Sequence, residues 1–284
     1  MDSFVCSLDL SDEIVVRRRK DKLINLTMCG MGSESIPPEN NVAFRAGEAF
    51  VQKYNTTGAD ITVFKNIPMG AGLGGSSADA AGVLNGLAEL YAVNDEGGIK
   101  ELADSLGSDT GYMLKGGFAR MTGRGTEVWR LNSKARLWLL LLCPKTPVST
   151  GKCYAEYDKA PDGAREDTER CIQAFLRGDY AGMGSSFYNA LQAPACKLNA
   201  DVATALSEIS AFSPLGYGMS GSGSAVFALF STRELCEWAK SRYKGKCRAY
   251  VLPTIVPQER SDKKIKWRNP FVLSEEEKEK AKGK

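Results

Sequence analysis

The chain has 284 residues, 43% of them hydrophobic, enough for one or two domains with proper cores, and its net charge of +3 is too small to favour nucleic-acid binding. Eight cysteines without a C-x-x-C pair and no histidine argue against a zinc site and exclude a Ser-His-Asp hydrolase. No apolar stretch indicates a signal peptide or membrane span. We therefore expect a cytoplasmic protein with free thiols, whose acid–base chemistry falls to Asp, Glu, Lys, Tyr or Cys.

The N-terminal part of the chain is predicted to form strands and then a helix. Glu13–Arg19 and Leu23–Met28 alternate apolar and polar residues, and they are expected to pair as a hairpin across Lys20–Lys22. The three arginines at 17–19 are interpreted as a solvated strand end. Prolines at 37 and 38 interrupt the chain, and a helix is predicted from Asn41 to Tyr54.

A glycine-rich stretch separates a strand-like run, Ile61–Ile67, from an apolar helix-like run that continues to Tyr91. Its glycines allow the backbone to approach a ligand closely, and the free N–H groups of a helix start bind anions. Ser76 and Ser77 are expected to cap this helix, and with Asp79 they could hold a metal bound to the anion. The stretch therefore predicts a phosphate site with a place for magnesium. It consists of Pro68, Met69, Gly70, Ala71, Gly72, Leu73, Gly74, Gly75, Ser76, Ser77 and Ala78.

The same stretch admits other interpretations. Gly70–Gly75 satisfies G-x-G-x-x-G, but a dinucleotide-binding fold needs an acidic residue at a strand end about 20 residues further on. Asp95 and Glu96 stand at that distance, within a loop-like segment. No lysine follows the glycines, which excludes a P-loop. A turn that only packs a helix on a sheet remains an alternative.

Asp109 is the candidate catalytic residue. It follows a short predicted helix, 99–106, and lies in a glycine-flanked turn before a semi-apolar run, where a carboxylate is partly desolvated. Such a carboxylate can orient a hydroxyl nucleophile and accept its proton. Capping of the next helix explains Asp109 equally well from the sequence alone.

The remaining elements follow in order. A strand and tight turn are predicted at 116–127, a buried strand at 137–143, and helices at 167–177, 180–191, 200–210 and 234–242. A last strand is expected at 247–252, and the charged segment 258–284 is expected to be an exposed tail. A second glycine turn lies between apolar flanks; a simple hairpin would explain it too. It contains Gly221, Ser222 and Gly223.

Three of these segments resemble one family. Pro68–Ala78, after a strand and before a helix, is similar to the phosphate loop P-x-G-x-G-L-G-[GS]-S-[SA] of the GHMP small-molecule kinases. Gly107–Gly111 is similar to the family's G-[AS]-D-[VI]-P, with Thr-Gly in place of Val-Pro, and Met219–Ser224 resembles its third motif. Within the superfamily, Ile67–Ala81 most resembles the kinases of 4-diphosphocytidyl-2-C-methyl-D-erythritol, from the non-mevalonate route to isoprenoid precursors.

The resemblance implies an α+β fold of two lobes, the first like a small ribosomal-subunit protein and the second ferredoxin-like. Residues 1–145 are then the ATP-binding domain and 146–257 the C-terminal domain. The implied reaction transfers a phosphoryl group from ATP, with Mg²⁺, to the 2-hydroxyl of that small-molecule substrate. The implied roles are catalysis by Asp109, metal placement by Ser77, phosphate closure by Gly221, Ser222 and Gly223, and substrate binding by Thr150 and Tyr154. Core packing is the alternative for Tyr154. A ligand contact or an ordinary cap would each account for Asn41.

The family's opening strand, P-[AG]-K-[IL]-N, and its G-Y-H segment have no counterpart in the chain, whose resemblance covers about residues 3–255. A shortened enzyme and a degenerate nucleotide-binding member are both consistent with this. We expect severely reduced activity for these residues alone, because positioning and electrostatics supply most of the catalysis in such kinases. A homoserine or mevalonate-type kinase is the near alternative. The oligomeric state is not predicted.

Overall fold

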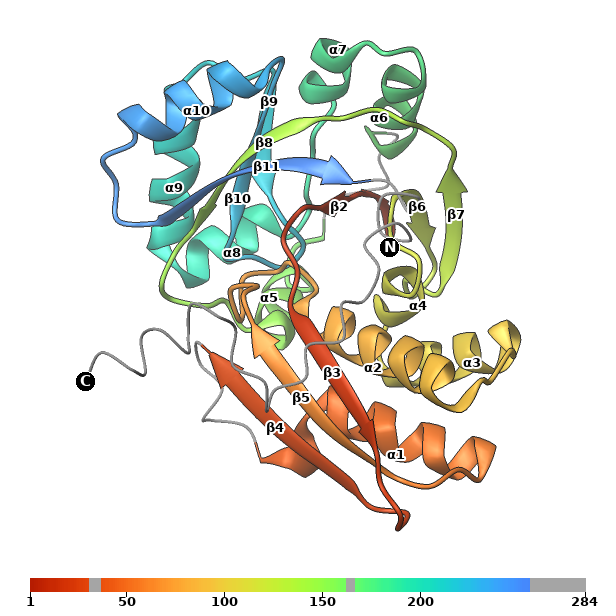
Figure 1. The fold of residues 1–284 in the computed structure, drawn as a ribbon. Helices are drawn as coiled ribbons and strands as arrows, with labels where there is room; N and C mark the ends of the chain where they lie inside the picture. Colours follow the sequence, from red (N-terminus) through yellow and green to blue (C-terminus); the bar gives the residue numbers. More distant parts are fainter. Residues whose placement is uncertain (31–36, 162–166, 256–284) are drawn as a thin grey trace, which may run out of the picture.

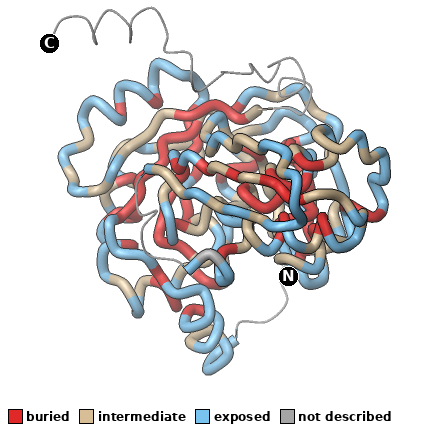
Figure 2. The backbone as a smooth tube through the Cα atoms, turned by 60° about the horizontal axis from the view of Figure 1, so that its bottom comes forward, coloured by how far each residue is buried: buried red, intermediate tan, exposed pale blue. Residues whose placement is uncertain are grey.

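The computed structural model describes residues 1–30, 37–161 and 167–255, and these residues form three β-sheets with helices packed against them (Figure 1). The predicted charged tail, 258–284, lies outside the described residues. Within the described ranges, no helix is long and apolar enough to span a lipid bilayer. Buried backbone segments run through the interior, and the exposed segments surround them (Figure 2).

The first sheet has the strand order β3-β5-β4. β3 (Glu13–Arg18) is antiparallel to β5 (Ala59–Lys65), whereas β4 (Ile24–Gly30) is parallel to it. The predicted hairpin between the first two segments is therefore wrong, because β5 lies between them. The turn after β3 holds the start of β5 instead: Arg19 N donates to Gly58 O at 2.9 Å, and Gly58 N donates to Asp21 O at 2.6 Å.

Two helices, α1 and α2, cover one face of this sheet, and a third, α3, packs against both of them (Figure 1). The first begins where predicted, because the Asn41 side chain accepts a hydrogen bond from Ala43 N at 2.9 Å. The cap interpretation of Asn41 is thereby confirmed. Phe50, Leu84 and Leu87 are fully buried between the helices and the sheet. The helices are α1 (Val42–Tyr54), α2 (Gly75–Tyr91) and α3 (Glu96–Leu106), with a short 3-10 turn, η1 (Pro38–Asn40), before α1.

The second sheet is a small antiparallel one with the order β1-β6-β7. On one side Tyr112, from the short helix α4, packs against Ala119 and Met121. On the other side Phe118 packs against Phe175 of α6, with ring centroids 4.6 Å apart. The tight turn predicted at 116–127 is confirmed. The elements are β1 (Asp2–Val5), β6 (Phe118–Thr122), β7 (Glu127–Leu131), α4 (Thr110–Met113) and α6 (Asp167–Leu176).

The third sheet is antiparallel with the order β2-β11-β8-β10-β9. β8 is buried on both faces, which explains its uninterrupted run of leucines. It pairs with strands that follow it in the chain, and the predicted domain boundary at residue 145 stays a prediction. The strands are β2 (Ser7–Leu8), β8 (Trp138–Cys143), β9 (Gly216–Met219), β10 (Val226–Phe230) and β11 (Arg248–Ile255).

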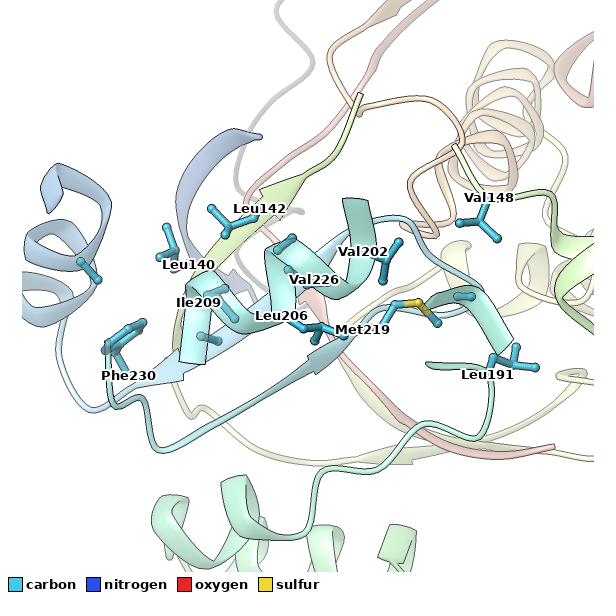
Figure 3. Close-up of a cluster of buried hydrophobic side chains, with 14 of the residues drawn as sticks. Leu140, Leu142, Val148, Leu191, Val202, Leu206, Ile209, Met219, Val226 and Phe230 are labelled. Carbon is cyan, nitrogen blue, oxygen red and sulfur yellow. The ribbon is translucent and has the colours of Figure 1, made fainter. Parts of the chain in front are cut away.

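Helices α9 and α10 close one face of this sheet over the cluster shown in Figure 3. The helix predicted at 180–191 is too long, because α7 ends at Ser185. Beyond it Asn189 Oδ1 accepts from Leu191 N at 2.9 Å, and such local side-chain bonds compete with helix formation. The helices of this half are α5 (Thr150–Tyr157), α7 (Tyr180–Ser185), α8 (Gln192–Leu198), α9 (Ala200–Ser210) and α10 (Arg233–Arg242).

Candidate active site

The two glycine-rich turns predicted to bind phosphate are in direct contact. Ser220 Oγ donates to Gly72 O at 2.9 Å, and Ala225 N donates to Ala71 O at 3.0 Å. Gly72 has a φ of +71°, and a Cβ atom there would lie 2.3 Å from Ser220 O. Glycine is therefore required at position 72, both for its backbone conformation and for the close approach of the second turn.

The first turn leads directly into α2, but its serines do not cap the helix. Gly74, with a φ of +68°, occupies the N-cap position and makes no side-chain cap bond, so that Ser76 and Ser77 lie inside the first helical turn. The prediction that these serines cap α2 is wrong, because the left-handed glycine starts the helix earlier. The first N–H groups of α2 are left without a side-chain cap, as an anion site at this helix start requires.

Asp109 occupies the N-cap position of α4, yet its side chain makes no capping hydrogen bond. The interpretation of Asp109 as a simple helix cap is therefore wrong. Ser108 Oγ donates to Asp109 Oδ1 at a long 3.5 Å. Burial raises the pKa of Asp109 above its usual value, and the Ser108 hydrogen bond offsets only part of this effect. A partly desolvated carboxylate without strong partners is suited to accept a proton.

The segment around Asp109 packs on the first glycine turn. A Cβ atom at Gly74 would lie 2.5 Å from Met113 Cε, and one at Gly107 would lie 3.7 Å from Ser77 Oγ. Ser77 therefore stands beside the loop that leads into Asp109. This arrangement brings the candidate catalytic carboxylate and the candidate metal-placing hydroxyl to the same end of α2.

The two predicted substrate residues lie on α5. Thr150 Oγ1 is 2.8 Å from Ser222 Oγ, which connects α5 to the second glycine turn. Tyr154 is 41% exposed, so the alternative of core packing for this tyrosine is wrong. Partial burial raises the pKa of Tyr154, and the charge of Asp109 raises it further, so the two side chains are electrostatic neighbours. Thr150 and Tyr154 are thus both brought to the region of the predicted phosphate site.

Asp79 does not lie open to a metal as predicted. Its Oδ2 accepts a hydrogen bond from Lys65 Nζ at 2.6 Å, and the same ammonium group is paired with Asp12. All three side chains are at most 5% exposed. We call Asp12, Lys65 and Asp79 the buried charge cluster. It lies beneath the first glycine turn, since a Cβ atom at Gly75 would be 3.7 Å from Lys65 Nζ.

The two carboxylates of this cluster differ in their pKa. Burial raises the pKa of Asp79 to about 7, against the opposing effect of Lys65, and Asp12 adds to the rise. Burial acts the same way on Asp12, but hydrogen bonds from Lys65 and from the N–H groups of Ile67 and Asn66 outweigh it and lower its pKa. Asp12 therefore carries the charge that pairs with Lys65, and Asp79 is the carboxylate that takes up a proton near neutral pH.

We expect Asp79→Asn to remove a pH dependence of stability. Burial in the fold raises the pKa of Asp79 from an ordinary 3.8 to about 7, so the folded protein retains a proton that the unfolded chain has lost. The free energy of unfolding should fall as the pH rises from about 4 to about 7, by on the order of 1 kcal/mol per pH unit, and then level off. Urea unfolding at several pH values measures this. Equal pH profiles for Asp79→Asn and wild type would contradict it.

Sequence reasoning missed the buried charge cluster and the residues that support the second glycine turn. Lys65 follows Ala59, Ile61 and Val63 at every second position of β5, and this period of two predicts an inward side chain. That signal was available in the sequence. Asn189 and Gln192, which bond to the backbone at Met219, carried no comparable signal.

The two glycine turns meet just before the start of α2, and comparison with known proteins identifies the family that has this arrangement. Residues 41–119 match the GHMP kinases N terminal domain, and residues 171–244 match the GHMP kinases C terminal domain. The chain belongs to the GHMP kinases. Membership confirms the expected α+β, two-lobed GHMP kinase fold, and it implies ATP as the phosphoryl donor.

Relatives within the family point to one branch of it. The 4-diphosphocytidyl-2-C-methyl-D-erythritol kinase of Pelotomaculum thermopropionicum is 33% identical over 84% of this chain and 83% of its own length. The enzyme of the same name from Moorella thermoacetica is 34% identical over 83% of each chain. A crystal structure of 4-(cytidine 5'-diphospho)-2C-methyl-D-erythritol kinase superposes with a TM-score of 0.74 at 27% identity, covering 89% of both chains. A homoserine kinase from Cytophaga hutchinsonii also gives 0.74, at 18% identity over 89% of both chains, which shows the fold alone.

Proposed function

We propose that the chain transfers the γ-phosphoryl group of ATP to the 2-hydroxyl of 4-diphosphocytidyl-2-C-methyl-D-erythritol. The names of its relatives at about one-third identity support the acceptor. The observation that carries the chemistry is the position of Asp109, a partly desolvated carboxylate on the segment that packs against the first glycine turn, whose charge also acts on Tyr154. A hydroxyl bound there would meet a base on one side and a phosphate-binding helix start on the other.

The residues have distinct roles in this reaction. The oxygen of the 2-hydroxyl bonds to the γ-phosphorus while Asp109 accepts the proton of that hydroxyl. The bond between the γ-phosphorus and the oxygen that bridges it to the β-phosphate breaks, and ADP leaves. The N–H groups of residues 70–77 and of residues 221 and 222 bind the triphosphate, whereas those of Ala78 and Gly223 already donate to Gly74 O and Ser220 O. Thr150 and Tyr154 position the acceptor, with the phenol ring stacked on its cytosine. The raised pKa of Asp109 makes it a stronger base than an exposed aspartate.

The donor set fits magnesium carried by the triphosphate. Mg²⁺ prefers oxygen ligands, and it commonly combines phosphate oxygens and water with one or two protein groups. The Ser77 hydroxyl lies partly buried beside the loop of Asp109 and would provide such a group. When bound, the ion neutralises negative charge on the transferring phosphoryl group. Asp79 is engaged with Lys65 and takes no part.

The direct test is a coupled assay of ADP release with the diphosphocytidyl methylerythritol, and with homoserine and mevalonate as control acceptors. We expect ADP release that depends on the first acceptor only. The assay should use residues 1–284 and, in parallel, a version that also carries the family's opening strand. Phosphate on the 2-hydroxyl of the product, located by NMR, would complete the assignment.

The outcomes separate the alternatives clearly. Release with homoserine or mevalonate in place of the expected acceptor would assign a different GHMP reaction. Absence of acceptor-dependent release in both versions, from protein that is folded and binds ATP, would overturn the proposal and leave a nucleotide-binding protein.

A further inference from the structure

The second glycine turn is held from outside by a segment that the proposed reaction does not use. This segment, residues 187–192, contains Asn189, in the link between α7 and α8, and Gln192, the first residue of α8. It bonds to the turn at the open edge of β9, which pairs with β10 on its other side. The segment contributes side chains to this contact, and the turn contributes backbone groups.

Asn189 satisfies its whole amide group at this place. Its Nδ2 donates to Met219 O and to Gly221 O, both at 2.8 Å, while its Oδ1 accepts from Leu191 N at 2.9 Å. Gln192 Oε1 accepts from Met219 N at 3.0 Å. The Met219 side chain points into the core cluster near Leu191 (Figure 3) and is 2% exposed. Met219, at the start of the turn, is thereby held through both its backbone and its side chain.

These bonds determine the orientation of the peptide group between residues 221 and 222. In a trans peptide the carbonyl and the following N–H point in opposite directions. Because Gly221 O points at Asn189, the N–H of Ser222 points away from it. The Ser222 hydroxyl lies 2.8 Å from Thr150 Oγ1, and Ser220 Oγ bonds to Gly72 O. The turn is therefore flanked by the first glycine turn and by α5.

We propose that Asn189 is a positioning residue for the phosphate site, which orients the Ser222 N–H toward the nucleotide phosphates. The inference rests on the proposed function, because it takes ATP to be the ligand of the two turns. Asn189 does not touch the nucleotide itself. A side chain with two N–H donors and one acceptor suits this place, and an aspartate of the same shape would place negative charge against two carbonyl oxygens.

The test compares Asn189→Asp and Asn189→Ala with wild type by calorimetric titration with a non-hydrolysable ATP analogue and with adenosine, in the absence of acceptor. We expect the Kd of the ATP analogue to rise at least about tenfold in Asn189→Asp, because a backbone N–H donor to a charged phosphate is misaligned. The Kd of adenosine should stay unchanged, since it carries no phosphate. Tyr243→Phe is the control: it removes hydrogen bonds to Glu208 and Cys247 in the same half, away from the turn.

Because the titration measures binding of the ATP analogue without any acceptor, its outcome tests the role of Asn189 separately from the proposed reaction. A selective loss of ATP affinity would support Asn189 even if the acceptor proved to be a different one. An unchanged Kd for the ATP analogue in both Asn189 variants would overturn the inference while leaving the kinase reaction in place. Equal losses for the ATP analogue and adenosine, or a loss matched by Tyr243→Phe, would reduce Asn189 to a structural residue. If Asn189→Asp does not fold, Asn189→Ala decides the question by the same criteria.

Discussion

Replacement of Asp109 by asparagine is expected to lower kcat by about 10²–10⁴-fold, because asparagine keeps the shape of the side chain but cannot accept the proton. The Kd of ATP should change little, since no phosphate contact is assigned to this side chain. Steady-state kinetics of ADP release and a separate nucleotide titration measure the two quantities. A variant with more than about a tenth of the wild-type kcat would remove Asp109 from the role of general base.

The pH profile provides an independent check of the same role. Activity of the wild type should rise with pH through the pKa of Asp109, which burial places above the usual range of an aspartate. The variant should lack this limb. Asp104→Asn is the matched control, because it neutralises a carboxylate five positions earlier that is paired with Lys100. Its kcat should equal that of the wild type.

Lys65→Met is expected to lower the free energy of unfolding by roughly 3–5 kcal/mol, more than any other single variant considered. It leaves the buried carboxyl groups of Asp12 and Asp79 without their shared cation. For a chain of this size the melting temperature should fall by about 10 °C. Urea and thermal unfolding monitored by circular dichroism would measure both effects. A Lys65→Met protein as stable as the wild type would contradict the ion-pair geometry.

A triple variant provides the control for this prediction. Asp12→Asn and Asp79→Asn, combined with Lys65→Met, remove all three ionisable groups, so that no unpaired charge remains buried. Replacement of a whole buried ion-pair group is often neutral, whereas removal of one partner is not. The triple variant should therefore recover much of the stability that Lys65→Met loses. Failure to recover would show that packing, and not charge, is the origin of the loss.

The location of the cluster gives these variants a second effect. Asp12 precedes β3, Lys65 ends β5 and Asp79 lies in the first turns of α2, so the cluster joins both ends of the first glycine turn to the sheet. Asp12 Oδ1 also accepts from Ile67 N at 2.8 Å, next to the proline that opens the turn. Loss of Lys65 should therefore weaken ATP binding as well as stability.

Local signals in the sequence located most of the candidate site. A strand, a run of glycines and an apolar helix are encoded by consecutive residues, and the structure forms them in that order. The site roles of Asp109, Thr150 and Tyr154 came from the resemblance and stay predictions. Features that depend on neighbours in space could not be predicted from the sequence. The position of β5 between β3 and β4, for example, is decided by how the buried face of β5 packs. The helix start at Gly74 depends on a left-handed backbone that residue type alone does not impose.

The pairing of β2 with β11 has a consequence for the order of events during synthesis. Leu8 lies opposite Thr254, so β2 bonds to a strand that leaves the ribosome roughly 250 residues later. At about 5–20 residues per second, β2 waits roughly 10–50 s for this partner. Ser7, in the same strand, meanwhile finds a nearer partner in Gly117, whose N–H it accepts at 2.9 Å. The five-stranded sheet is therefore completed only after β11 has been synthesised.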